Sequence, residues 1–206
     1  MKKSILTILA IATITACKKH DTVVADTSQD TMAVSDNMQI DNDSAAVSDS
    51  ATTSSAANAT SDLSNQDKMF ADEAAKGGLM EIMTGKLAAE KGTAASVKTL
   101  GQMMVNDHTK ASNELKGWAA KAGYTLPAKL DADQQKKYDD LKAKSGADFD
   151  RMYADLMVAD HKKVIAAFKK ESAEGKDNAL KSFAGKTVPT LEHHLMESEK
   201  TKTAVK

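Results

Sequence analysis

The sequence predicts an all-α protein: a four-helix bundle with one short extra helix, preceded by a lipoprotein signal peptide and a disordered linker. Three observations support this prediction. Beyond residue 65, apolar residues recur at spacings of three and four, which is the period of an amphipathic helix. The 206 residues include two Pro, one Trp, three Tyr and four Phe, a composition that argues against a β-sandwich or barrel. Glycines at 92, 123, 146 and 175 fall where the helical patterns end.

Composition also excludes several classes of function. The formal net charge is −1, so the chain lacks the basic surplus of a nucleic-acid-binding protein, and we expect no nucleic-acid partner. A single cysteine excludes an internal disulfide framework and a multi-cysteine zinc site. The sequence has no Gly-rich phosphate loop, no GxSxG elbow and no HExxH motif. The absence of these motifs favours a protein that is not an enzyme, although it does not exclude an enzymatic activity.

Residues 1–16 have the pattern of a bacterial lipoprotein signal peptide. Lys2 and Lys3 precede a short apolar run that is too short to span a bilayer comfortably. The run ends in Ile-Thr-Ala-Cys, which resembles a lipobox and implies lipidation of Cys17 and cleavage before it. The alternative is an ordinary cleaved signal peptide with an incidental cysteine. Lys18 follows the cysteine, which favours an outer-membrane lipoprotein of the bacterial cell envelope, facing the periplasm or the cell surface.

Residues 17–65 predict a tether that begins at Cys17 and is rich in Asp, Ser, Thr and Ala. The segment contains no aromatic residue, so it can bury too little apolar surface to offset its ordering entropy. We therefore expect a disordered spacer that separates the folded domain from the membrane.

Residues 66–203 predict the helical bundle. Long helices are expected over about 65–91, 93–123, 147–173 and 177–201, and a short one over about 131–144. Thr93 is the expected N-cap of the second helix, and Pro189 predicts a kink or a restart in the last. The long connection between the second and third long helices predicts either a crossover along the bundle or a cap over one end.

Four polar residues lie on helix faces that are otherwise apolar or small, one on each long helix. They are Glu81, His108, His161 and His194. Bundle cores build metal sites from such inward side chains, and this donor set suits Fe, Zn, Mn or Cu. Asp107, Asp160, Glu192 and His193 are alternates, or partners that orient an imidazole. The competing interpretation is a metal-free polar core that fixes the helix register.

A short motif recurs in the second and third long helices. Residues 104–108 read Met-Val-Asn-Asp-His and residues 157–161 read Met-Val-Ala-Asp-His, which indicates that both segments face one environment. The Glu-x-x-His pair of di-iron carboxylate proteins is absent, which counts against a di-iron oxidase.

Several motifs together resemble a known family. Residues 103–108 (MMVNDH), 123–127 (GYTLP), 147–153 (ADFDRMY), 160–161 (DH) and 188–195 (VPTLEHHL) are similar to the family named domain of unknown function 4142. The resemblance covers roughly residues 67–201 and implies a ferritin-like bundle in an exported or outer-membrane protein. The family has no settled activity, and fold alone does not give function. The resemblance adds weight to Glu81, Asp107, His108, Asp160, His161 and one of His193 and His194; the helical stripe favours His194.

The sequence thus predicts a lipid-anchored envelope protein, held to the membrane through Cys17, whose bundle binds one transition-metal ion. The alternative is a metal-free structural or interaction module of the envelope, active in stress response or adhesion. A metal-dependent oxidoreductase is the lowest-ranked alternative. The protein partner, if there is one, and the oligomeric state are not readable from the sequence.

Overall fold

A computed structural model describes residues 63–206, and over this range the protein is all-helical. Its helices are α1 (Asn65–Lys91), α2 (Ala95–Ala122), α3 (Ala132–Lys142), α4 (Gly146–Glu174) and α5 (Asn178–Ala204). The predicted signal peptide, the lipidated Cys17 and nearly all of the tether lie outside the described residues. None of the described helices combines the length and apolar character needed to cross a membrane.

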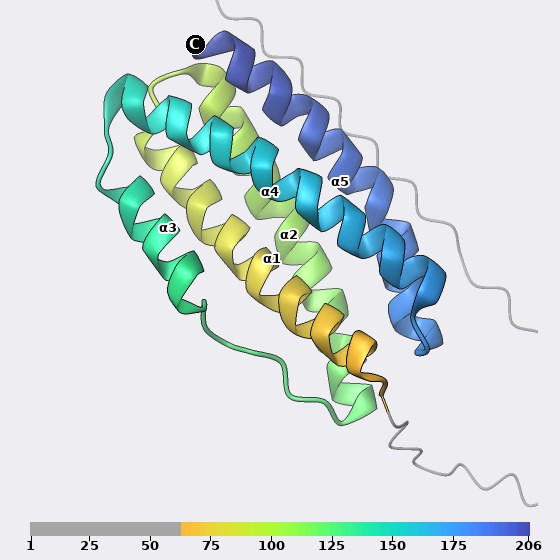
Figure 1. Cartoon of the computed structure of the whole chain (residues 1–206). Coiled ribbons are helices and arrows are strands. Elements are labelled where there is room, and N and C mark those ends of the chain that lie inside the picture. The colour runs from red at the N-terminus through yellow and green to blue at the C-terminus, as the bar shows by residue number, and fades with distance from the viewer. Residues whose placement is uncertain (1–62) are drawn as a thin grey trace, which may run out of the picture. The chain divides into compact units, whose positions relative to one another are not determined.

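The four long helices form two hairpins, α1 with α2 and α4 with α5 (Figure 1). The hairpins are joined because α1 packs on α4 and α2 packs on α5. Helix α1 runs antiparallel to α4. Asp67 near its start accepts hydrogen bonds from the backbone of Lys176 and Asp177 just after α4, and Lys91 at its end donates to the carbonyl of Lys144 just before α4.

The connection between α2 and α4 is a crossover along the bundle, and it does not cap one end. It follows α1 lengthwise: Tyr124 donates to Asp72 (3.0 Å), Asp131 pairs with Lys76 (3.4 Å), and the carbonyl of Lys142 accepts from Lys91. Helix α3 lies within this connection and packs on α1 and α4. The crossover alternative is therefore the correct one.

The bundle interior contains two apolar clusters. One is centred on Phe70, Leu115, Phe168, Phe183 and Leu191, and the other on Leu100, Met104, Phe149, Tyr153 and Met157. The polar residues predicted to face inward, Glu81, His108, His161 and His194, are buried, and each lies at or beside the boundary between these two clusters. The core is therefore apolar above and below a polar layer.

Two glycines bring α1 and α2 close together beside this layer. A Cβ added at Gly85 would lie 2.8 Å from the carbonyl oxygen of Gly101, and a Cβ added at Gly101 would lie 2.6 Å from that of Gly85. Only glycine permits this backbone approach. Gly85 is one helical turn beyond Glu81, so the close contact fixes the position of Glu81 against α2.

Helix α2 begins differently from the prediction. Thr93 is not its N-cap, because the helix starts at Ala95 after Ala94, which has no capping side chain. Instead Asp150 on α4 accepts hydrogen bonds from the backbone N–H of Thr93 (3.0 Å) and of Ala94 (2.8 Å), and from the Thr93 hydroxyl. A carboxylate from another helix thus accepts from the backbone donors that lead into α2 and lies at the positive end of the helix.

The expected restart at Pro189 does not occur, since α5 continues as one helix from Asn178 to Ala204. Pro189 is exposed. Its ring leaves the carbonyl of Gly185, four residues earlier, without an N–H partner and crowds that carbonyl, but Gly185 has no side chain that would add to the steric crowding.

The Asp150 cap yields a stability prediction. Burial would raise the pKa of the Asp150 carboxyl, but the hydrogen bonds from Thr93 and Ala94 outweigh burial and lower it. We expect Asp150→Ala to reduce the free energy of unfolding, measured by urea denaturation, by about 2 kcal/mol at neutral pH. Because the folded pKa is depressed, this difference should hold above about pH 5 and shrink as the pH falls below about 4.

The control is Asp148→Ala, which removes an exposed carboxylate that pairs with Arg151 one turn along the same helix. Such exposed pairs contribute little, so its effect should stay within about 0.5 kcal/mol. Equal effects of the two substitutions would contradict the assigned cap.

Candidate metal centre

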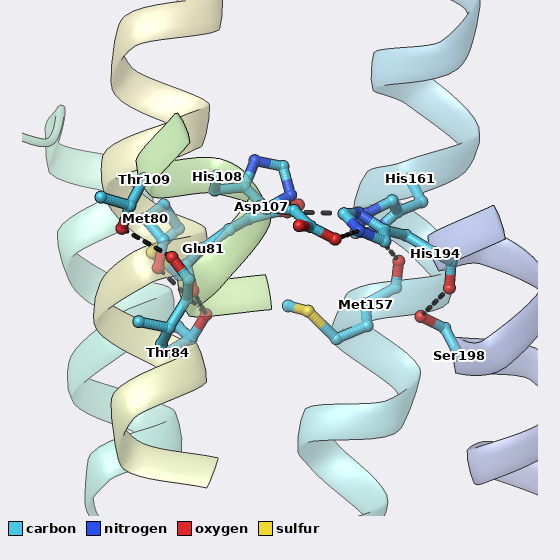
Figure 2. Close-up of polar contacts among 11 residues, drawn as sticks. Met80, Glu81, Thr84, Asp107, His108, Thr109, Met157, His161, His194 and Ser198 are labelled. Atoms are coloured by element: carbon cyan, nitrogen blue, oxygen red, sulfur yellow. Dashed lines mark hydrogen bonds and ion pairs between the residues drawn. The ribbon is translucent and has the colours of Figure 1, made fainter. Parts of the chain in front are cut away.

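The polar layer brings one side chain from each long helix into a single buried cluster (Figure 2). Glu81 comes from α1, His108 from α2, His161 from α4 and His194 from α5. Their exposed fractions are 5%, 9%, 0% and 1%, so the cluster is shielded from bulk water. A buried carboxylate needs compensating partners, because burial of an isolated ionised carboxylate is strongly unfavourable.

The four side chains are within reach of a common ligand. One nitrogen from each of His108, His161 and His194 lies within 4.8 Å of the other two. The Oε2 atom of Glu81 contacts Nε2 of His108 and lies 3.5 Å from Nε2 of His161. The sequence-predicted residues Glu81, His108, His161 and His194 are therefore brought together in space.

Two of the imidazoles are oriented through their second nitrogen. Nδ1 of His161 lies 2.9 Å from the carbonyl oxygen of Met157, to which it donates when protonated, and its Nε2 points into the cluster. Nε2 of His194 lies 3.1 Å from Oδ2 of Asp107, and its Nδ1 is buried without a hydrogen-bond partner in the described residues. Figure 2 shows Asp107 reaching from α2 towards His194. Metal-binding histidines are held in this way by a carbonyl or a carboxylate on the far nitrogen.

Two nitrogens of the cluster lack hydrogen-bond partners among residues 63–206. Glu81 Oε2 and His108 Nε2 contact each other, whereas His161 Nε2 and His194 Nδ1 are buried and have no hydrogen-bond partner in the described part of the chain. Buried polar atoms are nearly always satisfied, so two unsatisfied imidazole nitrogens beside a buried ion pair require an explanation. All four atoms, Glu81 Oε2 and the three imidazole nitrogens, can donate a lone pair to a cation when the imidazoles are neutral.

The electrostatics of the cluster favour a positive charge at its centre. Burial would raise the pKa of Glu81, but the charges of His108 and His161 and the contact with His108 outweigh burial and lower it. Burial would lower the pKa of His108, but the charge of Glu81 and their contact raise it. Both shifts favour an ionised Glu81–His108 pair in the metal-free cluster.

His194 behaves differently from His108. Burial lowers its pKa, and the hydrogen bond to Asp107 opposes this but does not prevail, so that the pKa is about 4. His194 is therefore neutral at pH 7, the form in which imidazole binds metals.

The alternates of the sequence analysis separate into two groups. Asp107 joins the cluster through His194, as described above. Asp160 is partly buried and pairs with Lys137 of α3 at 3.4 Å, so it does not contact the imidazoles of the cluster. Glu192 is exposed and pairs with Lys169 at 2.7 Å, and His193 is exposed. The structure thus separates the two adjacent histidines, with His194 inside and His193 outside.

Sequence reasoning missed Tyr153 as a member of this region. Its ring is fully buried in a core cluster, on the inward face of α4. Its hydroxyl, however, has no hydrogen-bond partner among residues 63–206. Burial, with the charge of Glu81 as a second cause, raises the pKa of this phenol. The signal in the sequence was the residue type itself: position 153 lies on the inward face of its helix, where Leu or Phe would fill the core without a polar hydroxyl.

With this geometry in hand, the chain can be compared with known proteins. Residues 52–201 match the family described as Domain of unknown function (DUF4142). The chain belongs to this family. No match was found among curated proteins.

The fold of this DUF4142 member is similar to a solved structure described as a DUF305 fragment from Deinococcus radiodurans. The TM-score is 0.60 at 11% sequence identity, with 69% of this chain and 98% of that chain covered. At this identity the likeness shows the fold alone, so function has to be argued from the cluster itself.

The coupling between Glu81 and His108 can be measured in the metal-free protein. After treatment with EDTA, the imidazole of His108 should titrate with a pKa above its ordinary 6.5, followed by two-dimensional NMR of its ring carbon and proton. Glu81→Gln removes the charge that raises this pKa most and leaves burial, the largest cause, opposed by the weaker effect of Asp107, so the pKa of His108 should fall below 6.5. Glu192→Gln, an exposed substitution on α5, should leave it unchanged. A wild-type midpoint below 6.5 would disprove the ionised pair.

Proposed function

We propose that this DUF4142 member is a metal-binding protein of the bacterial cell envelope, anchored through lipid on Cys17. In this proposal one divalent transition-metal ion is held by Oε2 of Glu81, Nε2 of His108 and of His161, and Nδ1 of His194. The observation that carries it is the convergence of these four buried atoms, of which His161 Nε2 and His194 Nδ1 have no hydrogen-bond partner in the described residues.

The donor set supports a transition metal over Ca²⁺ or Mg²⁺. Three imidazoles and one carboxylate suit Zn, Fe, Mn or Cu, whereas Ca²⁺ and Mg²⁺ prefer oxygen ligands. The far-nitrogen contacts of His161 and His194 also match the arrangement found around metal ligands. The lengthwise crossover between α2 and α4 supports a ferritin-like arrangement of the four long helices, since such bundles share that connection.

A metal-free structural module is the second candidate, and one observation favours it. Glu81 and His108 already form a buried ion pair, which fixes the two helices relative to each other without a metal. Under this candidate the cluster is a polar core and the protein acts through its surface. An oxidoreductase remains the lowest-ranked candidate. The buried hydroxyl of Tyr153, which is unpaired in the described residues and whose pKa is raised by burial and by the charge of Glu81, supports it, and the missing Glu-x-x-His pair opposes it.

The adjacent histidines 193 and 194 supply a matched test of metal binding. Purified protein, stripped with EDTA and then dialysed against Zn²⁺ or Co²⁺, should retain one ion per chain by elemental analysis. His194→Ala should weaken binding at least 100-fold, measured by competition titration, because it removes a ligand. His193→Ala, on the same helix but exposed, should bind like the wild type. Asp107→Asn should weaken binding about 10- to 100-fold, since it removes the partner that orients His194.

Two outcomes would reject the metal. One is a wild-type protein that retains no Zn²⁺, Co²⁺, Mn²⁺, Fe²⁺ or Cu²⁺. The other is equal affinity in His194→Ala and His193→Ala. Either result would leave the metal-free polar core as the better account.

The membrane anchor is tested separately, in cells. The full chain should carry diacylglycerol at Cys17, detected by mass spectrometry of the N-terminal peptide, and should fractionate with the outer membrane. Cys17→Ser should remove the lipid and release the protein from the membrane, because a stable anchor requires the acyl chains. A Cys17→Ser protein that stays membrane-bound would reject the anchor.

A further inference from the structure

A cavity of about 210 Å³ lies in the core of the bundle, and all five helices contribute to its wall. Glu73 of α1 and Lys163 of α4 are exposed and line it, together with Gln134 of α3, so the cavity reaches the surface between these three helices. Protein interiors contain few voids larger than a water molecule. A cavity of this size therefore needs an explanation other than ordinary packing.

The cavity is adjacent to the imidazole cluster but separate from it. Glu81 and His108 line the cavity, whereas His161 and His194 are not among its lining residues. Oε2 of Glu81 and Nε2 of His108, by which these two side chains contact each other, are fully buried. A molecule in the cavity thus meets the flank of the ion pair and not the atoms proposed to bind a metal. The lining of the metal-free protein therefore determines what the cavity binds.

Gly77 contributes to this volume without a conformational or packing reason to be glycine. It lies inside α1, its φ is not positive, and a Cβ added there would meet no atom of the described residues within 4 Å. At Gly85, further along the same helix, a Cβ would collide with the backbone of α2. A glycine inside a helix is less favourable than alanine. The helix thus gives up stability at position 77 and leaves space in the cavity, as is common at binding sites.

Three phenylalanines from three helices form the apolar wall of the cavity. Phe70 of α1 packs edge-on against Phe168 of α4, with ring centroids 4.8 Å apart, and the ring of Phe183 on α5 lies 5.8 Å from that of Phe168. Leu115 and Leu191 extend this surface. Aromatic rings favour such edge-on and tilted contacts, so the wall suits a further ring.

The volume limits the size of the ligand. An apolar cavity of about 150 Å³ accommodates benzene, so 210 Å³ has room for a benzene ring with a short substituent.

The charged groups of the lining balance one another. Three are acidic and three are basic when His108 carries the proton that Glu81 favours; they are Glu73, Glu81, Asp160, Lys137, Lys163 and His108. Glu81 pairs with His108, and Asp160 pairs with Lys137 at 3.4 Å. Glu73 and Lys163 are exposed at the opening, where water weakens their interactions. A charged ligand would lose its hydration without gaining an unpaired counter-charge inside the cavity, so the lining favours a neutral one.

We infer that this cavity is a binding site for a small, neutral, mainly apolar molecule about the size of a substituted benzene ring. Its ring lies against Phe70, Phe168 and Phe183, and the space beside Gly77 contributes to its fit. The inference goes beyond the proposed metal site and does not depend on it.

Toluene is the probe, added to purified protein that has been treated with EDTA. Saturable shifts are expected in the NMR signals of the methyl groups of Leu115, Val164 and Leu191, which line the cavity. The methyl signals of Leu100 and Leu141, in the other apolar cluster, should not shift. Benzoate and benzylammonium, which carry the same ring with a negative or a positive charge, should bind at least tenfold more weakly than toluene.

Filling the space at position 77 tests the location of the site. Gly77→Leu should weaken toluene binding at least tenfold, because its side chain occupies the cavity. Gly77→Ala, which adds one methyl group where no described atom lies within 4 Å, should weaken it at least twofold and serves if Gly77→Leu does not fold, as judged by circular dichroism. Gly117→Leu is the matched control, since a Cβ at Gly117 on α2 also meets no described atom within 4 Å and the residue lies outside this cavity. It should bind toluene like the wild type.

Three results would overturn the inference. The first is no saturable shift at the cavity residues, or equal shifts at Leu100 and Leu141. The second is benzoate or benzylammonium binding as tightly as toluene. The third is wild-type affinity for toluene in the folded position-77 variants. None of these results bears on the metal site, which is tested by the affinity of His194→Ala for metal.

Discussion

The carboxylate of Glu81, buried at the centre of the bundle, is the constraint on which the rest of the structure depends. Its charge would be unfavourable there without the imidazoles of His108 and His161, and the backbone contact between Gly85 and Gly101 holds α1 where these contacts form. The apolar clusters on either side exclude water, which strengthens each interaction within the layer. One charged group thus couples helix packing to the chemistry of the site.

Helical periodicity was sufficient to predict the helices and the inward residues. The stripe positions of Glu81, His108, His161 and His194 follow from 3.6 residues per turn, and the apolar residues of each stripe determine which way the stripe faces. The same reasoning separated His194 from His193. The family match over residues 52–201 agrees with the resemblance seen in the sequence.

Features that depend on contacts between helices were not predictable in this way. Asp150 caps α2 from across the bundle, and Asp107 orients His194 on a different helix. Neither contact leaves a local pattern, since the partners are about 56 and 87 residues apart. The cavity beside Glu81 depends on how four helices and α3 meet. The repeated Asp-His motif illustrates the limit: both histidines point inward, but Asp107 contacts His194 while Asp160 contacts Lys137, because α3 packs beside α4.

The central claim is that four atoms from four helices share one metal ion. X-ray absorption spectroscopy of the Zn²⁺-loaded protein tests it directly, because the scattering from imidazole rings is distinctive. The account predicts about three imidazole nitrogens and at least one oxygen at roughly 2.0–2.2 Å, with an imidazole lost in His161→Ala. A first shell made of oxygen alone, or a spectrum unchanged in His161→Ala, would contradict it.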